Sequence, residues 1–182
     1  SKIMKQKTIR TLCAIILCIT TLLGAQFVAP FSAYAAKQST VYSIATDIIN
    51  WKKSTVGSNA DGHLMNDGFL SLAGTTPGDW YPIGLGRLGI TDNQTGYLAV
   101  INENVQKRYQ TAEKLDRTKA TEWHRISLAV LASGGDPRHM GVNGEIDLIA
   151  DGTYNRGLTV SPGRQGINGW IWGLIALDSR RY

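Results

Sequence analysis

Apolar side chains recur at a spacing of three and four residues in three segments of the chain, as they do on one face of a helix. The segments begin at Val41, Leu98 and Trp123. Each pattern predicts an amphipathic helix that turns one face toward a core. No segment alternates apolar and polar residues over a length that predicts a sheet. The stripes consist of Val41, Ile44, Ala45 and Ile48; of Leu98, Ile101, Val105 and Tyr109; and of Trp123, Ile126, Ser127, Val130 and Leu131.

Capping residues and glycines indicate where these helices begin and end. The third helix has Thr118 or Thr121 as its expected N-cap, and the run Gly-Gly-Asp-Pro at residues 134–137 is expected to stop it. Shorter helices are expected at residues 80–88 and 146–151. The chain therefore predicts an all-α domain of about seven helices joined by Gly-rich turns, with one layer of helices wrapped around another.

The last apolar segment differs from the others. Residues 167–177 read INGWIWGLIAL and are apolar nearly all round. A helix of this kind is not expected at a surface, so we expect other elements to enclose it. Few helices remain to do so. We therefore interpret the chain as the front part of something longer, with a domain that is incomplete at its C-terminal end.

Three glycines, Gly84, Gly86 and Gly89, lie within or just after the helix expected at residues 80–88. Glycine costs about 1 kcal/mol relative to alanine in a helix interior, so this repeated use needs a reason. Close approach of a second helix is one explanation, and a wall that faces a ligand is the other.

The first 35 residues differ in composition from the rest of the chain. They hold four of the 19 Lys and Arg residues and no acid, which leaves 15 bases against 14 acids in residues 36–182. A basic stretch, an apolar run at residues 12–23 and an A-x-A pattern at residues 33–35 are typical of an export signal. We therefore expect a signal peptide at residues 1–35, cleaved after Ala35, and a secreted or cell-surface protein. An uncleaved membrane anchor is the alternative.

The chain that follows the signal has few of the groups that metal and cofactor sites require. Cys13 and Cys18 both lie in the signal, so no disulfide or cysteine ligand is expected beyond it. His63, His124 and His139 lack the spacing of zinc ligands, and no phosphate loop or dinucleotide glycine fingerprint occurs. The near balance of charge also argues against nucleic-acid binding. We expect no metal site, no cofactor and no nucleic-acid partner.

Two groups of polar residues are candidates for chemistry. Glu122 and His124 flank Trp123 at a helix start, but adjacent helical residues diverge by about 100°, so the three cannot all face one site. A core tryptophan between two surface polar residues is the alternative. Asp147 and Asp151 lie four residues apart and would share a helix face, as paired carboxylates in acid–base chemistry do. A helix end that carries surface acids explains that pair equally well.

Tryptophan is unusually frequent in the helical segments. Trp170 and Trp172 are about 200° apart around a helix, so one can pack outward while the other lines an interior. Aromatic side chains around a concave site suit an apolar, isoprenoid or sugar ligand, and plain core packing is the alternative. The tryptophans in helical segments are Trp80, Trp123, Trp170 and Trp172.

Three separated runs resemble one known group of proteins. They are GDWYPIGLGRLG at residues 78–89, TEWHR at 121–125 through GDP at 135–137, and QGING at 165–169 through ALDS at 176–179. They resemble exported Firmicutes proteins with a terpenoid-cyclase/protein-prenyltransferase-like α/α-toroid, the prenyltransferase/squalene-oxidase-repeat proteins. The resemblance spans about residues 40–182. It implies a ring of paired inner and outer helices, of which this chain resembles the N-terminal half.

The catalytic motifs of that superfamily are not carried over. The D-x-D-D acid motif of squalene-type cyclases is absent, and the Asp-Cys-His zinc set of protein prenyltransferases has no cysteine here after residue 35. The D-G-G-W/F segment and the D-x-D-x-T-A-M-A-like helix of the family are also missing. Residues 165–170 only loosely resemble the Q-and-W repeat of cyclases. The resemblance therefore implies a fold without an activity.

The sequence favours a secreted or cell-surface toroid domain without catalysis, which binds an apolar or amphipathic ligand, or a protein partner, at a concave centre. One alternative is an isoprenoid-acting enzyme with Asp147 or Asp151 as its acid and the rest of its site in a missing half. The other is a structural spacer of a larger surface protein. Contact with a membrane is expected only through an uncleaved signal. The expected ligand-binding residues are Asp79, Trp80, Glu122, His124, Trp170 and Trp172.

Overall fold

The computed structural model describes residues 39–55, 62–180 and 182. These residues form helices and loops, with one isolated antiparallel bridge between Met140 and Ile146 and no strand among them. The prediction of an all-α protein is therefore confirmed. The expected signal peptide lies outside the described residues. Among the helices that are described, none has the length and apolar character needed to cross a bilayer.

The chain separates into two units, residues 1–52 and residues 53–182. The described part of the first unit is a helix that runs through residues 39–55 and ends just inside the second unit. This confirms that the stripe beginning at Val41 lies on a helix. Val41, Ile44 and Ile48 are 55%, 54% and 58% exposed, so the face that was expected to meet a core is not buried among the described residues.

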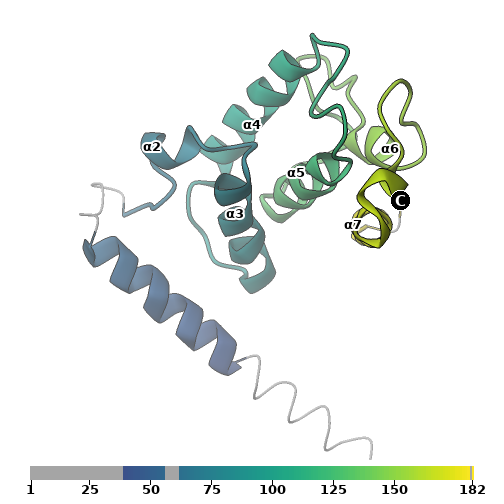
Figure 1. Cartoon of the computed structure of the whole chain (residues 1–182). Coiled ribbons are helices and arrows are strands. Elements are labelled where there is room, and N and C mark those ends of the chain that lie inside the picture. The colour runs from purple at the N-terminus through teal and green to yellow at the C-terminus, as the bar shows by residue number, and fades with distance from the viewer. Residues whose placement is uncertain (1–38, 56–61, 181) are drawn as a thin grey trace, which may run out of the picture. The chain divides into compact units, whose positions relative to one another are not determined.

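Six helices and one 3-10 turn make up the described part of the second unit (Figure 1). Three of the helices match the periodic segments or the short helices predicted near residues 80, 98 and 123. The short helix at Leu148–Gly152 also lies within two residues of its predicted bounds, whereas the helix at Asp67–Leu70 and the 3-10 turn at Pro162–Gln165 were not predicted. The elements are α2 (Asp67–Leu70), α3 (Thr76–Leu88), α4 (Gln94–Arg108), α5 (Thr121–Ala132), α6 (Leu148–Gly152), η1 (Pro162–Gln165) and α7 (Ile167–Asp178).

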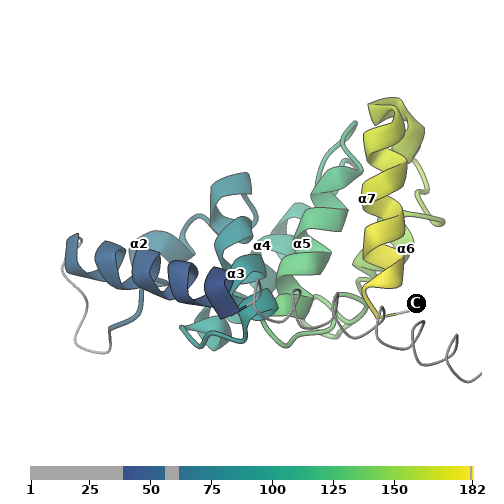
Figure 2. The ribbon, with the colours of Figure 1, turned by 90° about the horizontal axis from the view of Figure 1, so that it is seen from below.

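Helix α5 lies at the centre of this unit. It packs against α3, α6 and α7, and Figure 2 shows it between α3 and α7. Trp123, Ile126 and Val130 on α5 are completely buried. Other helices of the unit contribute further fully buried apolar residues, namely Tyr97, Ile101 and Val105 from α4 and Leu148 from α6. Burial on several sides explains why α5 carries the strongest apolar stripe of the sequence.

The N-terminus of α5 is capped from a distant part of the chain. Ala120 occupies the N-cap position and offers no side-chain hydrogen bond, so the predicted caps Thr118 and Thr121 were wrong. Instead, the side-chain oxygen of Gln165 accepts a hydrogen bond from the Thr121 backbone N–H at 3.0 Å. The Gln165 amide also donates to the Thr121 hydroxyl at 2.9 Å. A residue of η1 thus satisfies a donor that the first turn of α5 leaves unpaired.

Helix α7 packs through its small residues rather than through its large apolar ones. Gly169, Gly173 and Ala176 are buried, while Ile167 and Leu174 are 72% and 66% exposed. The prediction that other elements enclose this helix was therefore wrong for the described residues. The physical reason is close backbone approach: a Cβ at Gly169 would lie 2.0 Å from the Pro162 carbonyl oxygen. The side chains opposite this tight face consequently point outward.

The three glycines of α3 and its C-terminus serve different purposes. A Cβ at Gly86 would lie 2.4 Å from the Ala132 carbonyl oxygen, so α3 and α5 approach closely there. No atom lies within 4 Å of the corresponding point at Gly84. Gly89 ends the helix in the left-handed conformation with φ of 67°. Close helix packing therefore accounts for one of the three.

Candidate functional site

A buried ionic cluster joins α3 to α5. The Arg125 Nε atom lies 2.8 Å from Oδ2 of Asp79, whose side chain is fully buried. The other carboxylate oxygen of Asp79 accepts hydrogen bonds from the Tyr97 hydroxyl and the Gly74 backbone N–H, both at 2.8 Å. Buried charge is tolerated only when it is paired and hydrogen-bonded in this way.

Glu122 completes the cluster from the first turn of α5. Its two carboxylate oxygens accept hydrogen bonds from the two terminal nitrogens of Arg125, and one of them lies 3.7 Å from Arg108. Burial disfavours the Arg125 charge, but the hydrogen bonds to Glu122 and Asp79 outweigh that penalty and raise its pKa. Two acids therefore balance two bases in the cluster.

Every N–H of the Arg125 guanidinium has a partner. Nε donates to Asp79, and the first terminal nitrogen donates to Glu122 and, at 3.4 Å, to the Thr76 hydroxyl. The second terminal nitrogen donates to Glu122 and, at 3.0 Å, to the Gly74 carbonyl. Because a guanidinium carries five N–H groups, none is left over for a ligand.

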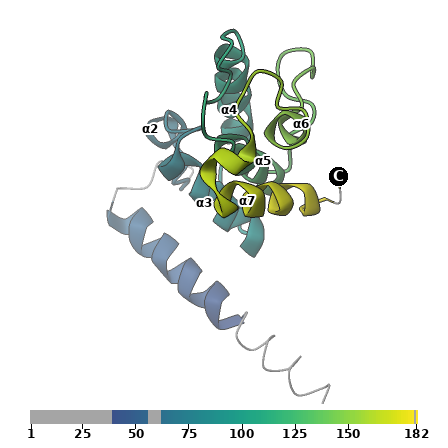
Figure 3. The same cartoon turned by 45° about the vertical axis from the view of Figure 1, so that its right-hand side comes forward.

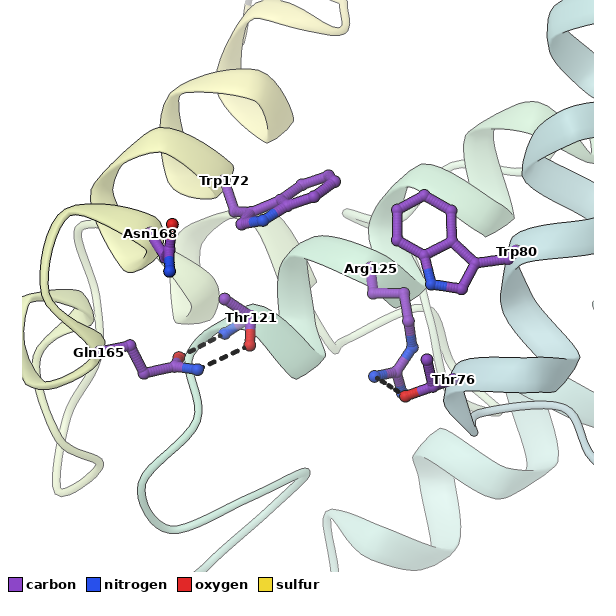
Figure 4. A pocket seen from close by; sticks show the side chains of 7 residues that line it. All are labelled: Thr76, Trp80, Thr121, Arg125, Gln165, Asn168 and Trp172. Carbon is purple, nitrogen blue, oxygen red and sulfur yellow. Dashed lines mark hydrogen bonds between the residues drawn. The ribbon is translucent and has the colours of Figure 1, made fainter.

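A polar pocket of about 370 Å³ opens beside this cluster (Figure 4). The hydroxyls of Thr76 and Thr121 and the amides of Gln165 and Asn168 contribute most of its polar groups. They come from α3, α5, η1 and α7, so four elements from distant parts of the chain meet here. The lining residues are Thr76, Trp80, Thr121, Arg125, Gln165, Asn168 and Trp172.

An apolar groove of about 610 Å³ lies on the same three helices, α3, α5 and α7. Figure 3 shows α7 alongside α5, as their packing requires. Aliphatic and aromatic side chains contribute most of its wall, and three charged side chains also line it. The lining residues are Trp80, Ile83, Gly86, Arg87, Leu128, Leu131, Ala132, Trp172, Ile175, Asp178, Ser179 and Arg180.

Trp80 and Trp172 belong to both the pocket and the groove. Their ring centroids lie 5.6 Å apart with an angle of 65° between the planes, an edge-to-face pair (Figure 4). This geometry is favourable for two aromatic rings and links α3 directly to α7. The pair therefore stands where a polar surface meets an apolar one.

The residues expected at the site occupy four different surroundings. Trp80 and Trp172 line the pocket and the groove. Asp79 and Glu122 form ion pairs with Arg125 and line neither cavity. Trp170 lies over Gly163 and lines neither cavity. Trp170 and Trp172 thus face different sides of α7, as their angular separation predicts.

His124 faces away from the pocket, toward α6 and α7. Its Nε2 atom lies 2.7 Å from the Gly152 carbonyl oxygen, and since a carbonyl only accepts, Nε2 carries the proton. The ring also borders Gly173 on α7. Burial lowers the pKa of His124, the hydrogen bond to Gly152 opposes this shift, and the nearby positive charge of Arg156 adds to it. His124 is therefore a neutral packing residue.

The two alternative acids lie outside the pocket and the groove. Asp147 is the N-cap of α6 and accepts a hydrogen bond from the Ala150 backbone N–H at 2.9 Å. Asp151 binds the Lys114 ammonium at 2.7 Å and accepts from the Tyr109 hydroxyl at 2.9 Å. Each carboxylate thus has a structural partner, and the structure does not bring the two to a shared substrate surface.

Five residues that line the polar pocket were not among the binding residues expected from the sequence. Arg125 had a local signal, since Glu122 precedes it by one helical turn, but its second partner, Asp79, is 46 positions away. The polar residues that share its pocket are ordinary surface types with no motif of their own. The residues that were missed are Thr76, Thr121, Arg125, Gln165 and Asn168.

Comparison of the chain with protein-family models, with curated proteins and with solved structures finds no match in any of the three. Among the residues that the structure describes, no group of three or more His, Cys, Asp or Glu side chains is placed to hold a metal ion. The geometry of the pocket and the groove is therefore what bears on function.

Proposed function

We propose that the protein binds an amphipathic small molecule, with the polar part of the ligand in the pocket and the apolar part in the groove. The observation that carries this proposal is the shared pair Trp80 and Trp172, which lines both cavities. The two volumes, about 370 and 610 Å³, fall in the range of small-molecule sites, about 300 to 1,000 Å³.

Binding without turnover is the form of this function that the pocket favours. A general acid or base must be able to exchange a proton with the ligand. Arg125 is the one charged residue among those found to line the polar pocket, and its N–H groups are all engaged. We therefore propose a binding domain rather than an enzyme.

We further propose that the domain is part of an α/α-toroid of the exported, surface-attached kind that the sequence resembles. The helix contacts support this: α5 packs against α3 and α7, the second helix before it and the second helix after it, as an inner helix of a ring would. Expression with residues 1–35 in a Gram-positive host, followed by N-terminal sequencing, should give a secreted product that begins at residue 36. Retention of the intact N-terminus in the cell would contradict export.

Isothermal titration tests the binding proposal with three amphiphiles that share an octyl chain: octyl β-D-glucoside, octyl phosphate and octyltrimethylammonium. Each is used below its critical micelle concentration. We expect at least one to saturate at one molecule per chain. Trp172→Ala should then weaken binding at least about tenfold, equivalent to about 1.4 kcal/mol.

The matched control is Trp170→Ala, because Trp170 lies on the same helix, is 55% exposed and lines neither cavity. It should leave the affinity within about twofold of the original. Circular dichroism should show that both variants stay folded. Equal losses in the two variants, or no saturation with any of the three probes, would overturn the proposal and favour a structural spacer.

A further inference from the structure

The polar pocket offers no free cationic group to an anion. Its one lining cation, Arg125, donates all five N–H groups to protein oxygens. Asp79 and Glu122 neutralise its charge, and the side chain is nearly buried. A phosphate or carboxylate head group would therefore have to break these bonds in order to gain a charged partner.

The pocket is equally unsuited to a cationic head group. The nearest carboxylates are those of Asp79 and Glu122, and neither lines the pocket. Both are bound to Arg125, and Asp79 has no exposed surface. An ammonium group would therefore leave water without meeting a free negative charge, which is costly.

Three neutral groups in the pocket remain able to form hydrogen bonds. The hydroxyls of Thr76 and Thr121 each accept one bond, from Arg125 and from Gln165, and neither donates to any residue that the structure describes. Within the same described set, the Asn168 side-chain amide has no hydrogen-bond partner. The two hydroxyls can donate a hydrogen bond to a ligand, and the amide can both donate and accept. Alcohol groups on a ligand suit these partners because they also donate and accept.

We propose that the polar pocket takes an uncharged, polyhydroxylated head group, such as a sugar ring, on a ligand whose hydrocarbon chain lies in the groove. This inference rests on the proposed function and names its ligand class. The edge-to-face pair of Trp80 and Trp172 supports it, because aromatic surfaces accommodate the C–H faces of a sugar as well as a chain. The ligand is thus of the glycolipid type.

The three octyl amphiphiles, together with methyl β-D-glucoside, also test this inference. Octyl glucoside should bind at least tenfold more tightly than octyl phosphate and octyltrimethylammonium. Methyl glucoside should bind at least tenfold more weakly than octyl glucoside, because it lacks the chain. Asn168→Ala and Thr76→Val should each weaken the binding of octyl glucoside by about threefold to tenfold. Both should leave the weak binding of the charged probes unchanged.

The control for these variants is Asn155→Ala, which removes an exposed amide that lines neither cavity. It should not change the affinity for octyl glucoside. If octyl phosphate or octyltrimethylammonium binds best and still requires Trp172, the proposed function stands and the sugar head group is wrong. If methyl glucoside binds as tightly as octyl glucoside, the head group is right and the amphipathic function is wrong. Octyl glucoside binding that is indifferent to both Asn168 and Thr76 would overturn the inference.

Discussion

Arg125 shows how much of this structure depends on a single side chain. It reaches from α5 to the buried Asp79 on α3 and to the carbonyl of Gly74, and it binds Glu122 in the preceding turn of its own helix. Because Asp79 has no access to water, its charge depends on this guanidinium for compensation. The same residue forms part of the polar pocket, so folding and the binding surface share one group.

Replacing Arg125 by methionine should therefore cost about 3 to 5 kcal/mol of unfolding free energy, because a buried carboxylate is left unpaired. Urea denaturation measures the loss. The matched control is Arg138→Met, since Arg138 is 45% exposed and lies 3.6 Å from Asp136. A partly exposed pair of this kind contributes about 1 kcal/mol or less. Similar losses in the two variants would contradict the role given to Arg125.

His124 makes the free energy of unfolding decrease as the pH falls. Burial lowers its folded pKa below the value near 6.5 of the unfolded chain, so the unfolded chain binds the proton first as the pH falls. The contribution of neutral His124 to the free energy of unfolding is complete above about pH 6.5. It is lost progressively below that pH, at no more than about 1.4 kcal/mol per pH unit. Urea titrations at pH 7 and pH 5 should show a larger loss for the original protein than for His124→Gln. A larger loss in the variant would refute the assignment.

At the scale of the elements, hydrophobic periodicity predicted the helices well and their surroundings poorly. The stripes beginning at Leu98 and Trp123 mark α4 and α5 because both helices bury one or more continuous faces. The apolar run at residues 167–177 gave the right helix and the wrong environment. Composition reports how apolar a helix is, but the small residues that permit close packing decide which face is covered.

The residues of the site that could be predicted are those with a local sequence signal, and most of the others depend on distant contacts. Trp80 and Trp172 could be picked out because tryptophans in short Gly-containing helices are unusual. Arg125 and Gln165 could not, because they bind partners more than 40 positions away, such as Thr121, which is 44 positions from Gln165. Asn168 could not either, because it lines the pocket without a hydrogen-bond partner among the described residues. His124 was grouped with Glu122 by adjacency, yet the helical turn directs the two side chains to different neighbours.

The glycines of α3 provide a matched test of close packing between elements. Gly86→Ala should destabilise the protein by about 1 to 3 kcal/mol, because the new methyl group would meet the Ala132 backbone at 2.4 Å. Gly84→Ala should stabilise it by about 0.4 to 1 kcal/mol, since no atom lies within 4 Å and alanine restricts the unfolded chain. Thermal melts of both variants measure whether each one is less or more stable than the original protein. Shifts in the same direction would contradict the packing described for α3 and α5.

At the scale of the whole molecule, the outer face of α7 is an extended apolar surface of the second unit. Ile167, Ile171 and Leu174 follow helical spacing and are 72%, 45% and 66% exposed. Contiguous apolar surface of this kind favours association between molecules. The interior of the unit is organised around α5, so this face contributes little to the core.

Leu174→Lys should therefore reduce self-association while it changes the unfolding free energy by no more than about 0.5 kcal/mol. Sedimentation velocity across a range of protein concentrations measures the effect. The control is Leu158→Lys, because Leu158 is 96% exposed and lies in the loop between α6 and η1 rather than on α7. It should leave association unchanged. Equal effects of the two substitutions would show that the added charge, and not the α7 face, controls self-association.

The capping of α5 by Gln165 also has a consequence for the order of events during synthesis. Thr121 leaves the ribosome 44 residues before its capping partner. At about 5 to 20 residues per second, the first turn of α5 waits roughly 2 to 9 seconds for that partner. During this interval the central helix of the unit has an open end, and α3 can pack against it before α7 exists. A chain that emerges N-terminus first, from the ribosome or on the far side of a membrane, is thus expected to assemble α3 with α5 first and to close the cap last.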